Sequence, residues 1–226
     1  MKHFTLTGTI QPQTLFKGRS ESFQIDNFEV TLTDGRIEVS YDAPETETGA
    51  REAAKSLVEA MSTREGQPYK LALEGISEEY INASLSFAPE GSEPVHKVTK
   101  QIRLRYVVAK PPDANLITES LGLMKKCKSD RNLAEAVEYY NEALGDDNSL
   151  YAIHKAVEAL THAMGGQEQL AKLVGEPKKY VNDITQTAQL KRHSFSANRG
   201  AQKLLSEEEC VKRTNKLILA YANKIK

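Results

Sequence analysis

A chain of 226 residues, 39% hydrophobic and 27% charged, has the composition of an ordinary globular protein with one large domain or two small ones. Two cysteines exclude a disulfide framework and a paired-cysteine zinc site, and no apolar run approaches the roughly 18 residues of a membrane span. The first residues lack the apolar core of a signal peptide, so we expect a cytoplasmic protein with no membrane contact.

The net charge of -1 conceals an asymmetry between the two halves of the chain. Residues 1–120 carry 13 Lys/Arg against 18 Asp/Glu, whereas residues 121–226 carry 17 against 13. This split indicates two units with different surfaces, and neither is charged strongly enough to require a polyanionic partner.

Alternating apolar residues predict antiparallel strands in the first half of the chain. The alternation is found in residues 4–10, 22–32, 37–41, 69–73, 81–87 and 98–108. Asp34-Gly35 is the strongest hairpin signal, because a type I′ turn needs positive φ at both central positions, and a second turn is expected at Glu74-Gly75. One helix is predicted over residues 50–61.

Lys110-Pro111-Pro112 marks a boundary, since two prolines cannot continue a strand, and helical patterns follow it. They cover residues 133–144, 148–164 and 167–174, then a helix after Pro177 and a last helix after Ser206. Ser206 and Glu209 have the spacing of a capping box. The sequence therefore predicts an α+β protein: a mainly antiparallel sheet with one helix (1–110), a lead-in (111–130) and a helical bundle (131–226).

Polar residues follow one face of the helix over residues 148–164. His154, Glu158 and His162 lie four residues apart, a spacing that suits metal binding or acid–base chemistry. The outer histidines are about 12 Å apart along the axis, so the helix alone cannot bind a metal with them. The alternative is a polar surface on which Glu158 pairs with His154 and Lys155, and we predict no metal and no cofactor.

Residues 167–184 resemble a helix-turn-helix. The small Ala171 allows close helix packing, Gly175 suits a sharp turn, and Val181 and Ile184 are the apolar positions of the second helix. That second helix presents four polar residues to a DNA groove: Lys178, Lys179, Asn182 and Asp183.

A basic segment extends from Lys172 to Lys203, with seven Lys/Arg against Glu176 and Asp183. It suits phosphate contacts, although such a run is also a common solvated surface. The candidate nucleic-acid-binding residues are Lys178, Lys179, Asn182, Lys191, Arg192 and Arg199. A separate cluster of lysines surrounds Cys127 and can lower its thiol pKa, but without an obvious partner base we expect this cysteine to have an incidental role.

The order of elements after residue 133 carries a resemblance. A helix containing Tyr151-x-x-His154-Lys155-Ala156-Val157-Glu158 is followed by a short helical excursion, an Arg192-His193 loop and a capped last helix. This arrangement resembles HEPN-like helical bundles of bacterial stress, defence and methylamine-utilisation-associated proteins. Many members of that family are metal-independent, dimeric ribonucleases with an Arg-x(4–6)-His motif.

This sequence departs from the motif, because no arginine lies four to six residues before His193 or His162. The resemblance therefore implies a helical bundle and a homodimer, and its nearest equivalent of a catalytic site is Arg192 and His193 with Glu158. The sequence favours a non-catalytic accessory or sensing module acting through protein or RNA contacts. The alternatives are a helix-turn-helix DNA-binding regulator and a divergent ribonuclease.

Overall fold

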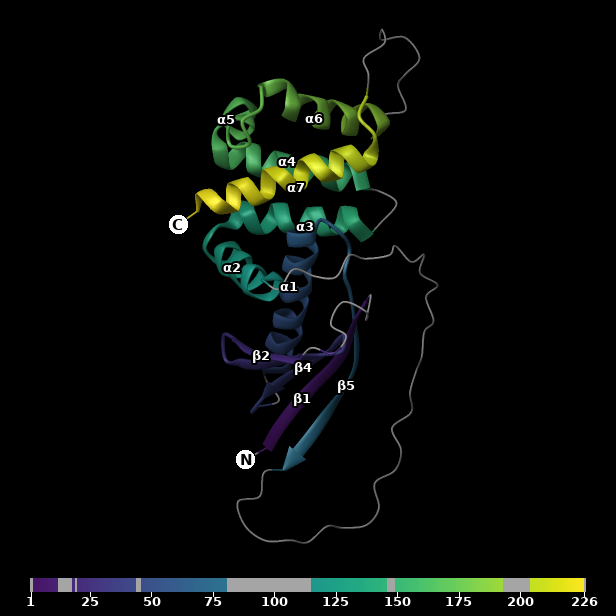
Figure 1. The fold of residues 1–226 in the computed structure, drawn as a ribbon, viewed down its shortest axis with the longest axis vertical. Helices are drawn as coiled ribbons and strands as arrows, with labels where there is room; N and C mark the ends of the chain where they lie inside the picture. The colour runs from purple at the N-terminus through teal and green to yellow at the C-terminus, as the bar shows by residue number, and fades with distance from the viewer. Residues whose placement is uncertain are drawn as a thin grey trace. The chain divides into compact units, whose positions relative to one another are not determined.

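The computed structural model describes residues 2–11, 18, 20–43, 46–80, 115–145, 149–192 and 204–225. The predicted α+β class is confirmed, with the five described strands and α1 (Glu47–Glu65) in the first part of the chain and helices after them (Figure 1). The chain divides into two compact units, one of residues 1–50 and 73–111 and the other of residues 51–72 and 112–226. Within the described stretches, no helix combines the length and apolar character needed to cross a membrane.

The elements in chain order are β1 (Lys2–Gln11), β2 (Ser20–Ile25), β3 (Phe28–Thr33), β4 (Arg36–Tyr41), α1 (Glu47–Glu65), β5 (Lys70–Tyr80), α2 (Leu116–Ser129), α3 (Arg131–Gly145), α4 (Ser149–Met164), α5 (Gln167–Lys172), α6 (Lys178–Arg192) and α7 (Glu207–Lys224). The helix predicted over residues 50–61 is thus longer at both ends, and the five predicted C-terminal helices all form.

The five strands form one sheet in the order β2-β3-β4-β1-β5. Cross-strand partners Phe4 and Tyr41 stack with ring centroids 5.4 Å apart, and Val30 pairs with Val39 in the buried face. The predicted Asp34-Gly35 hairpin is confirmed, since φ is 50° at Asp34 and 77° at Gly35. The alternation of apolar and polar residues therefore sets the register of the central strands.

Two predictions about the sheet were wrong. Residues 22–32 contain two strands rather than one, because the chain reverses at Asp26-Asn27, where Asp26 has a φ of 53°. Aspartate tolerates this left-handed conformation better than most residues, so the turn needs no glycine.

The turn expected at Glu74-Gly75 does not form, since β5 continues through it and the Gly75 carbonyl accepts a 3.3 Å hydrogen bond from Thr7 Oγ1. The strands predicted at 81–87 and 98–108 lie outside the described residues, as does Pro111-Pro112.

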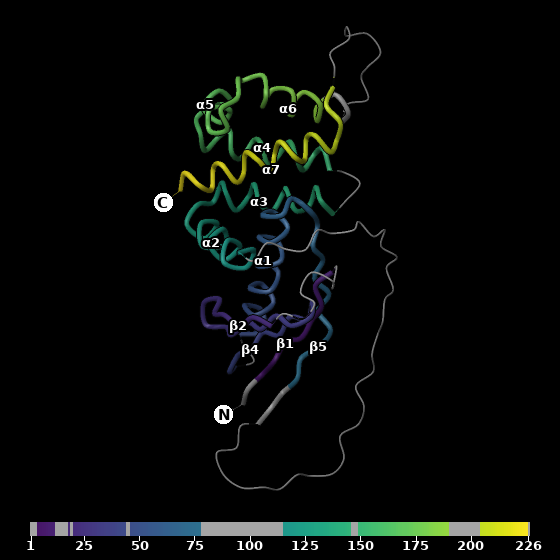
Figure 2. Tube along the Cα trace, viewed as in Figure 1, coloured from purple at the N-terminus to yellow at the C-terminus, as the bar shows by residue number. Residues whose placement is uncertain are grey.

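In the helical unit, α4 is the central element and contacts α3, α5, α6 and α7. Its predicted apolar face is buried, with Ile153, Val157 and Leu160 at 0% exposure. Tyr140 of α3 and Leu217 of α7 are also fully buried. Figure 2 shows the chain leaving α4 through α5 and returning along it as α6.

Residues 51–65 of α1 group with the helices, although their place in the chain had assigned them to the sheet domain. Asn141 of α3 donates hydrogen bonds from Nδ2 to the Glu59 carbonyl (3.2 Å) and to Thr63 Oγ1 (3.0 Å). Asn215 of α7 donates to the Thr63 carbonyl at 2.5 Å. These two amides join the last turns of α1 to α3 and α7.

Replacing Asn141 with Ala should lower the free energy of unfolding by about 1–3 kcal/mol, because it removes two interhelical hydrogen bonds to α1. Urea denaturation measures the loss. Asn223→Ala, an exposed asparagine of α7, is the matched control and should change stability by no more than about 0.5 kcal/mol. Equal effects of the two variants would show that Asn141 does not stabilise this junction.

Candidate functional site

The predicted helix–turn–helix arrangement of α5 and α6 is present. Gly175 has a φ of 72°, and the backbone N–H of Glu176 donates to the Ala171 carbonyl at 3.1 Å, which closes the turn. Ala171, Val181 and Ile184 are each 0% exposed. The small, flexible and apolar positions of the motif therefore hold the two helices together.

α6 has a buried face and an outer polar face. Val181, Ile184, Thr187 and Ala188 are buried. The outer face consists of exposed Lys178, Lys179, Gln186 and Gln189 with half-buried Asn182. Neither Lys178 nor Lys179 forms an ion pair with another residue in the part of the chain that the structure describes.

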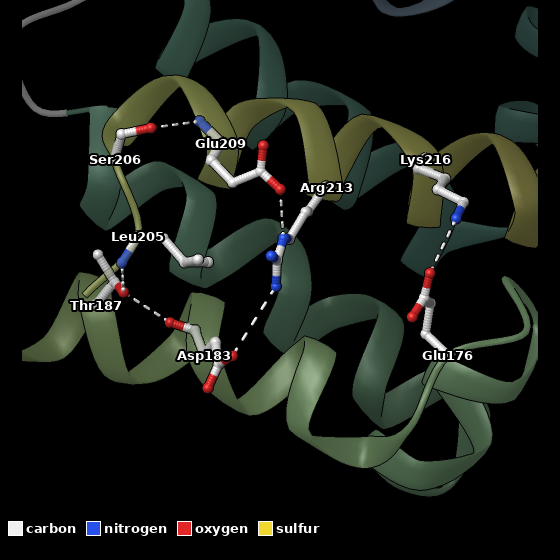
Figure 3. Close-up of polar contacts among 8 residues, drawn as sticks. All are labelled: Glu176, Asp183, Thr187, Leu205, Ser206, Glu209, Arg213 and Lys216. Carbon is white, nitrogen blue, oxygen red and sulfur yellow. Dashed lines mark hydrogen bonds and ion pairs between the residues drawn. The ribbon is translucent and has the colours of Figure 1, made fainter. Parts of the chain in front are cut away.

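A third side of α6 faces α7 through charged residues, which we call the α6–α7 seam: Glu176, Asp183, Glu209, Arg213 and Lys216. Arg213 donates from Nε to Glu209 Oε1 at 2.7 Å and lies 4.0 Å from Asp183 Oδ2 (Figure 3). Lys216 lies 3.4 Å from Glu176 Oε1. Basic side chains of α7 therefore pair with the acidic groups that precede and belong to α6, while the three carboxylates of the seam outnumber its two cations.

The seam also contains an aromatic contact. The guanidinium of Arg213 lies 4.6 Å from the centroid of the Tyr180 ring, and Lys216 Nζ lies 5.6 Å from it. Beside them, the Leu205 backbone N–H donates to Thr187 Oγ1 at 3.2 Å, and Ser206 Oγ accepts from the Glu209 N–H at 3.1 Å (Figure 3). The predicted Ser206 cap of α7 is thus confirmed.

Charge on the α5–α6 pair is therefore distributed unevenly. Its three acidic residues each have a basic partner: Glu168 with Lys172, Glu176 with Lys216, and Asp183 with Arg213. The two lysines of the outer face form no ion pair with a described residue, although the charge of Lys178 acts on the Glu168 carboxyl. The sequence lists these acidic and basic residues, but it does not reveal that side chains of α7 pair with Glu176 and Asp183.

The His154–Glu158–His162 stripe is divided among separate contacts. Glu158 Oε2 accepts a 2.8 Å hydrogen bond from Lys155 Nζ, and this bond lowers the pKa of the Glu158 carboxyl. His154 Nε2 lies 3.2 Å from Gln189 Nε2 of α6, and His162 is exposed. Within the described ranges, no three His, Cys, Asp or Glu side chains gather as metal ligands.

The backbone register separates Glu158 from Arg192. Gln189, near the end of α6, meets His154, near the start of α4, so the two helices run antiparallel. Arg192 lies three residues beyond Gln189, and Glu158 lies four residues from His154 in the opposite direction. At 1.5 Å per residue they are offset by about 10 Å along the axis.

Of the other predicted site residues, the structure describes either the backbone alone or nothing. Lys191 and Arg192 form the last two positions of α6, where the backbone is helical. His193 and Arg199 lie outside the described residues. The predicted group of Arg192, His193 and Glu158 therefore stays a prediction.

The lysines beside Cys127 in the sequence do not lower its pKa. Burial raises the pKa of this thiol to about 12, and the charges of Asp130 and Glu59 act in the same direction. The neighbouring lysines are close in sequence, but α2 turns Cys127 towards acidic groups. Cys127 is therefore a poor nucleophile.

Sequence reasoning also missed Arg213. Its ion pair with Glu209 could be predicted from their four-residue spacing on one helix. Its contacts with Asp183 and Tyr180, thirty or more residues away, had no local signal.

No protein-family model matches this chain, and no curated protein or solved structure matches it either. Function is therefore inferred from the residues and their geometry.

We expect Arg213→Ala to cost about 1–3 kcal/mol of unfolding free energy, because it removes a charge-assisted hydrogen bond, an ion pair and the Tyr180 contact. Lys216→Ala should cost less than about 1 kcal/mol, since Lys216 is 52% exposed against 20% for Arg213. Urea denaturation of both variants measures the difference. Equal costs would show that Arg213 does not dominate the seam.

Acid should weaken the seam through Glu209. The hydrogen bond from Arg213 lowers the pKa of the Glu209 carboxyl below its usual 4.5. The corresponding stabilisation is complete above 4.5 and is lost as pH falls through the lowered folded-state pKa. Unfolding free energy measured from about pH 6 to about pH 3 should therefore fall less steeply for Glu209→Gln than for the wild type. Glu208→Gln, an exposed neighbour with the same charge change, is the control and should keep the wild-type slope.

Proposed function

We propose that this chain is a non-catalytic accessory or sensing module that binds nucleic acid through the outer face of α6. The observation that carries this proposal is the pairing of Glu176 with Lys216 and of Asp183 with Arg213 at the α6–α7 seam. It leaves Lys178 and Lys179 as the dominant charges of the outer face, where they can contact phosphates.

The absence of a catalytic role is supported by the side chains that reaction chemistry would need. Glu158 is held by Lys155, and about 10 Å along the helix axes separates it from the level of Arg192. Burial keeps the Cys127 thiol protonated at neutral pH. These observations favour binding over chemistry in the described part of the helical unit.

The HEPN-like resemblance adds two expectations to this proposal, a homodimer and a role in bacterial stress or defence. The composition of the chain adds the expectation of a cytoplasmic location. A protein partner is the alternative ligand of the helical unit. It becomes the leading alternative if no nucleic acid binds.

Lys178→Ala combined with Lys179→Ala should weaken nucleic-acid binding and reduce the slope of log affinity against log salt by about 1 to 2. Fluorescence anisotropy with labelled single-stranded RNA and with labelled duplex DNA, across a salt series, measures both quantities. Lys55→Ala combined with Lys125→Ala removes the same charge from exposed positions of α1 and α2 and should leave binding unchanged.

Two results would contradict the proposal. Absence of binding to both probes at low salt would exclude a nucleic-acid ligand. Cleavage of the labelled RNA that disappears in His193→Ala would show that the protein is a ribonuclease.

A further inference from the structure

We infer that the nucleic acid is duplex DNA and that the outer face of α6 docks into its major groove. Lys178 and Lys179 then contact phosphates, while Asn182 and Gln186 read base edges. This inference rests on the proposed function, because it names the class of nucleic acid that the same face binds.

The shape of α6 fits B-form DNA. An α-helix with its side chains is about 10–12 Å wide, and the major groove of B-DNA is about 12 Å wide. The turn at Gly175 and the buried Ala171, Val181 and Ile184 join α6 to α5 as a supporting helix. The major groove of an RNA duplex is too narrow and deep for side chains to read in this way.

The chemistry of the outer face also favours duplex DNA over single-stranded RNA. Recognition of unpaired bases relies on stacking against exposed aromatic side chains. Tyr180 is the one aromatic residue of α6. The Arg213 guanidinium lies over its ring, 4.6 Å from the centroid, and so covers the surface on which a base would stack. The outer face offers amides and ammonium groups instead of a stacking surface.

The two amides have the spacing of base pairs that are two steps apart. Asn182 and Gln186 are one helical turn apart, about 6 Å along α6, which corresponds to about two base-pair steps of 3.4 Å. Asn and Gln can each form a bidentate pair with adenine N6 and N7. No described residue forms a hydrogen bond with the side-chain amide of either one.

The position of Asp183 in the structure differs from the one that the sequence motif predicts. The motif placed it among the groove-facing residues, whereas the structure pairs it with Arg213 of α7. This pairing keeps a carboxylate away from the phosphates and leaves Asn182 and Gln186 as the reading side chains.

The test is selection of the full-length protein on a duplex DNA library with a randomised centre. Binding should enrich a short site that contains adenines. Asn182→Ala and Gln186→Ala should each lose about 5- to 100-fold discrimination at one base of that site, the expected range for one bidentate pair. Lys178→Ala with Lys179→Ala should instead weaken every sequence similarly.

Asn223→Ala, which removes an exposed amide from α7, is the matched control and should keep the selected preference. Circular dichroism of each variant confirms that it folds. Failure to enrich any sequence, or unchanged base preferences in both amide variants, overturns the inference. If RNA or unselected duplex still binds through Lys178 and Lys179, the proposed function survives; if neither probe binds, both fail.

Discussion

Arg213 makes the contacts on which the arrangement of the α5–α6 pair depends. It bonds Glu209 on its own helix, lies near Asp183 on α6 and covers the ring of Tyr180. A planar guanidinium can make these contacts together, whereas an ammonium group would serve them less well. α6 is thus held between apolar packing on α4 and α5 and a largely polar contact with α7.

In this arrangement the acidic and basic side chains of α6 lie on different faces of the helix. Acidic side chains lie at the seam, where α7 compensates them, and basic and amide side chains lie on the outer face. A helix with only two lysines on its outer face can then present a positive surface. The electrostatic character of the proposed interface therefore depends on a helix that does not itself belong to it.

The polar stripe of α4 illustrates the opposite case. Three titratable residues at helical spacing suggested a site, but each is engaged or exposed separately: Glu158 with Lys155, His154 with Gln189, and His162 at the surface. Regular spacing on one helix aligns side chains along an axis, while a chemical site needs groups that converge from several elements. In the described residues, convergence occurs at the α6–α7 seam.

The sequence by itself determined what depends on short-range physics. Hydrophobic period located most of the strands and helices. Asp34-Gly35 specified a hairpin through positive φ, and Ser206 capped α7 through a hydroxyl three residues from its partner N–H. Tertiary structure decided which acidic group meets which base. It paired Asp183 with Arg213 and carried β5 through Glu74-Gly75, because such contacts join distant segments and leave no periodic signal in the chain.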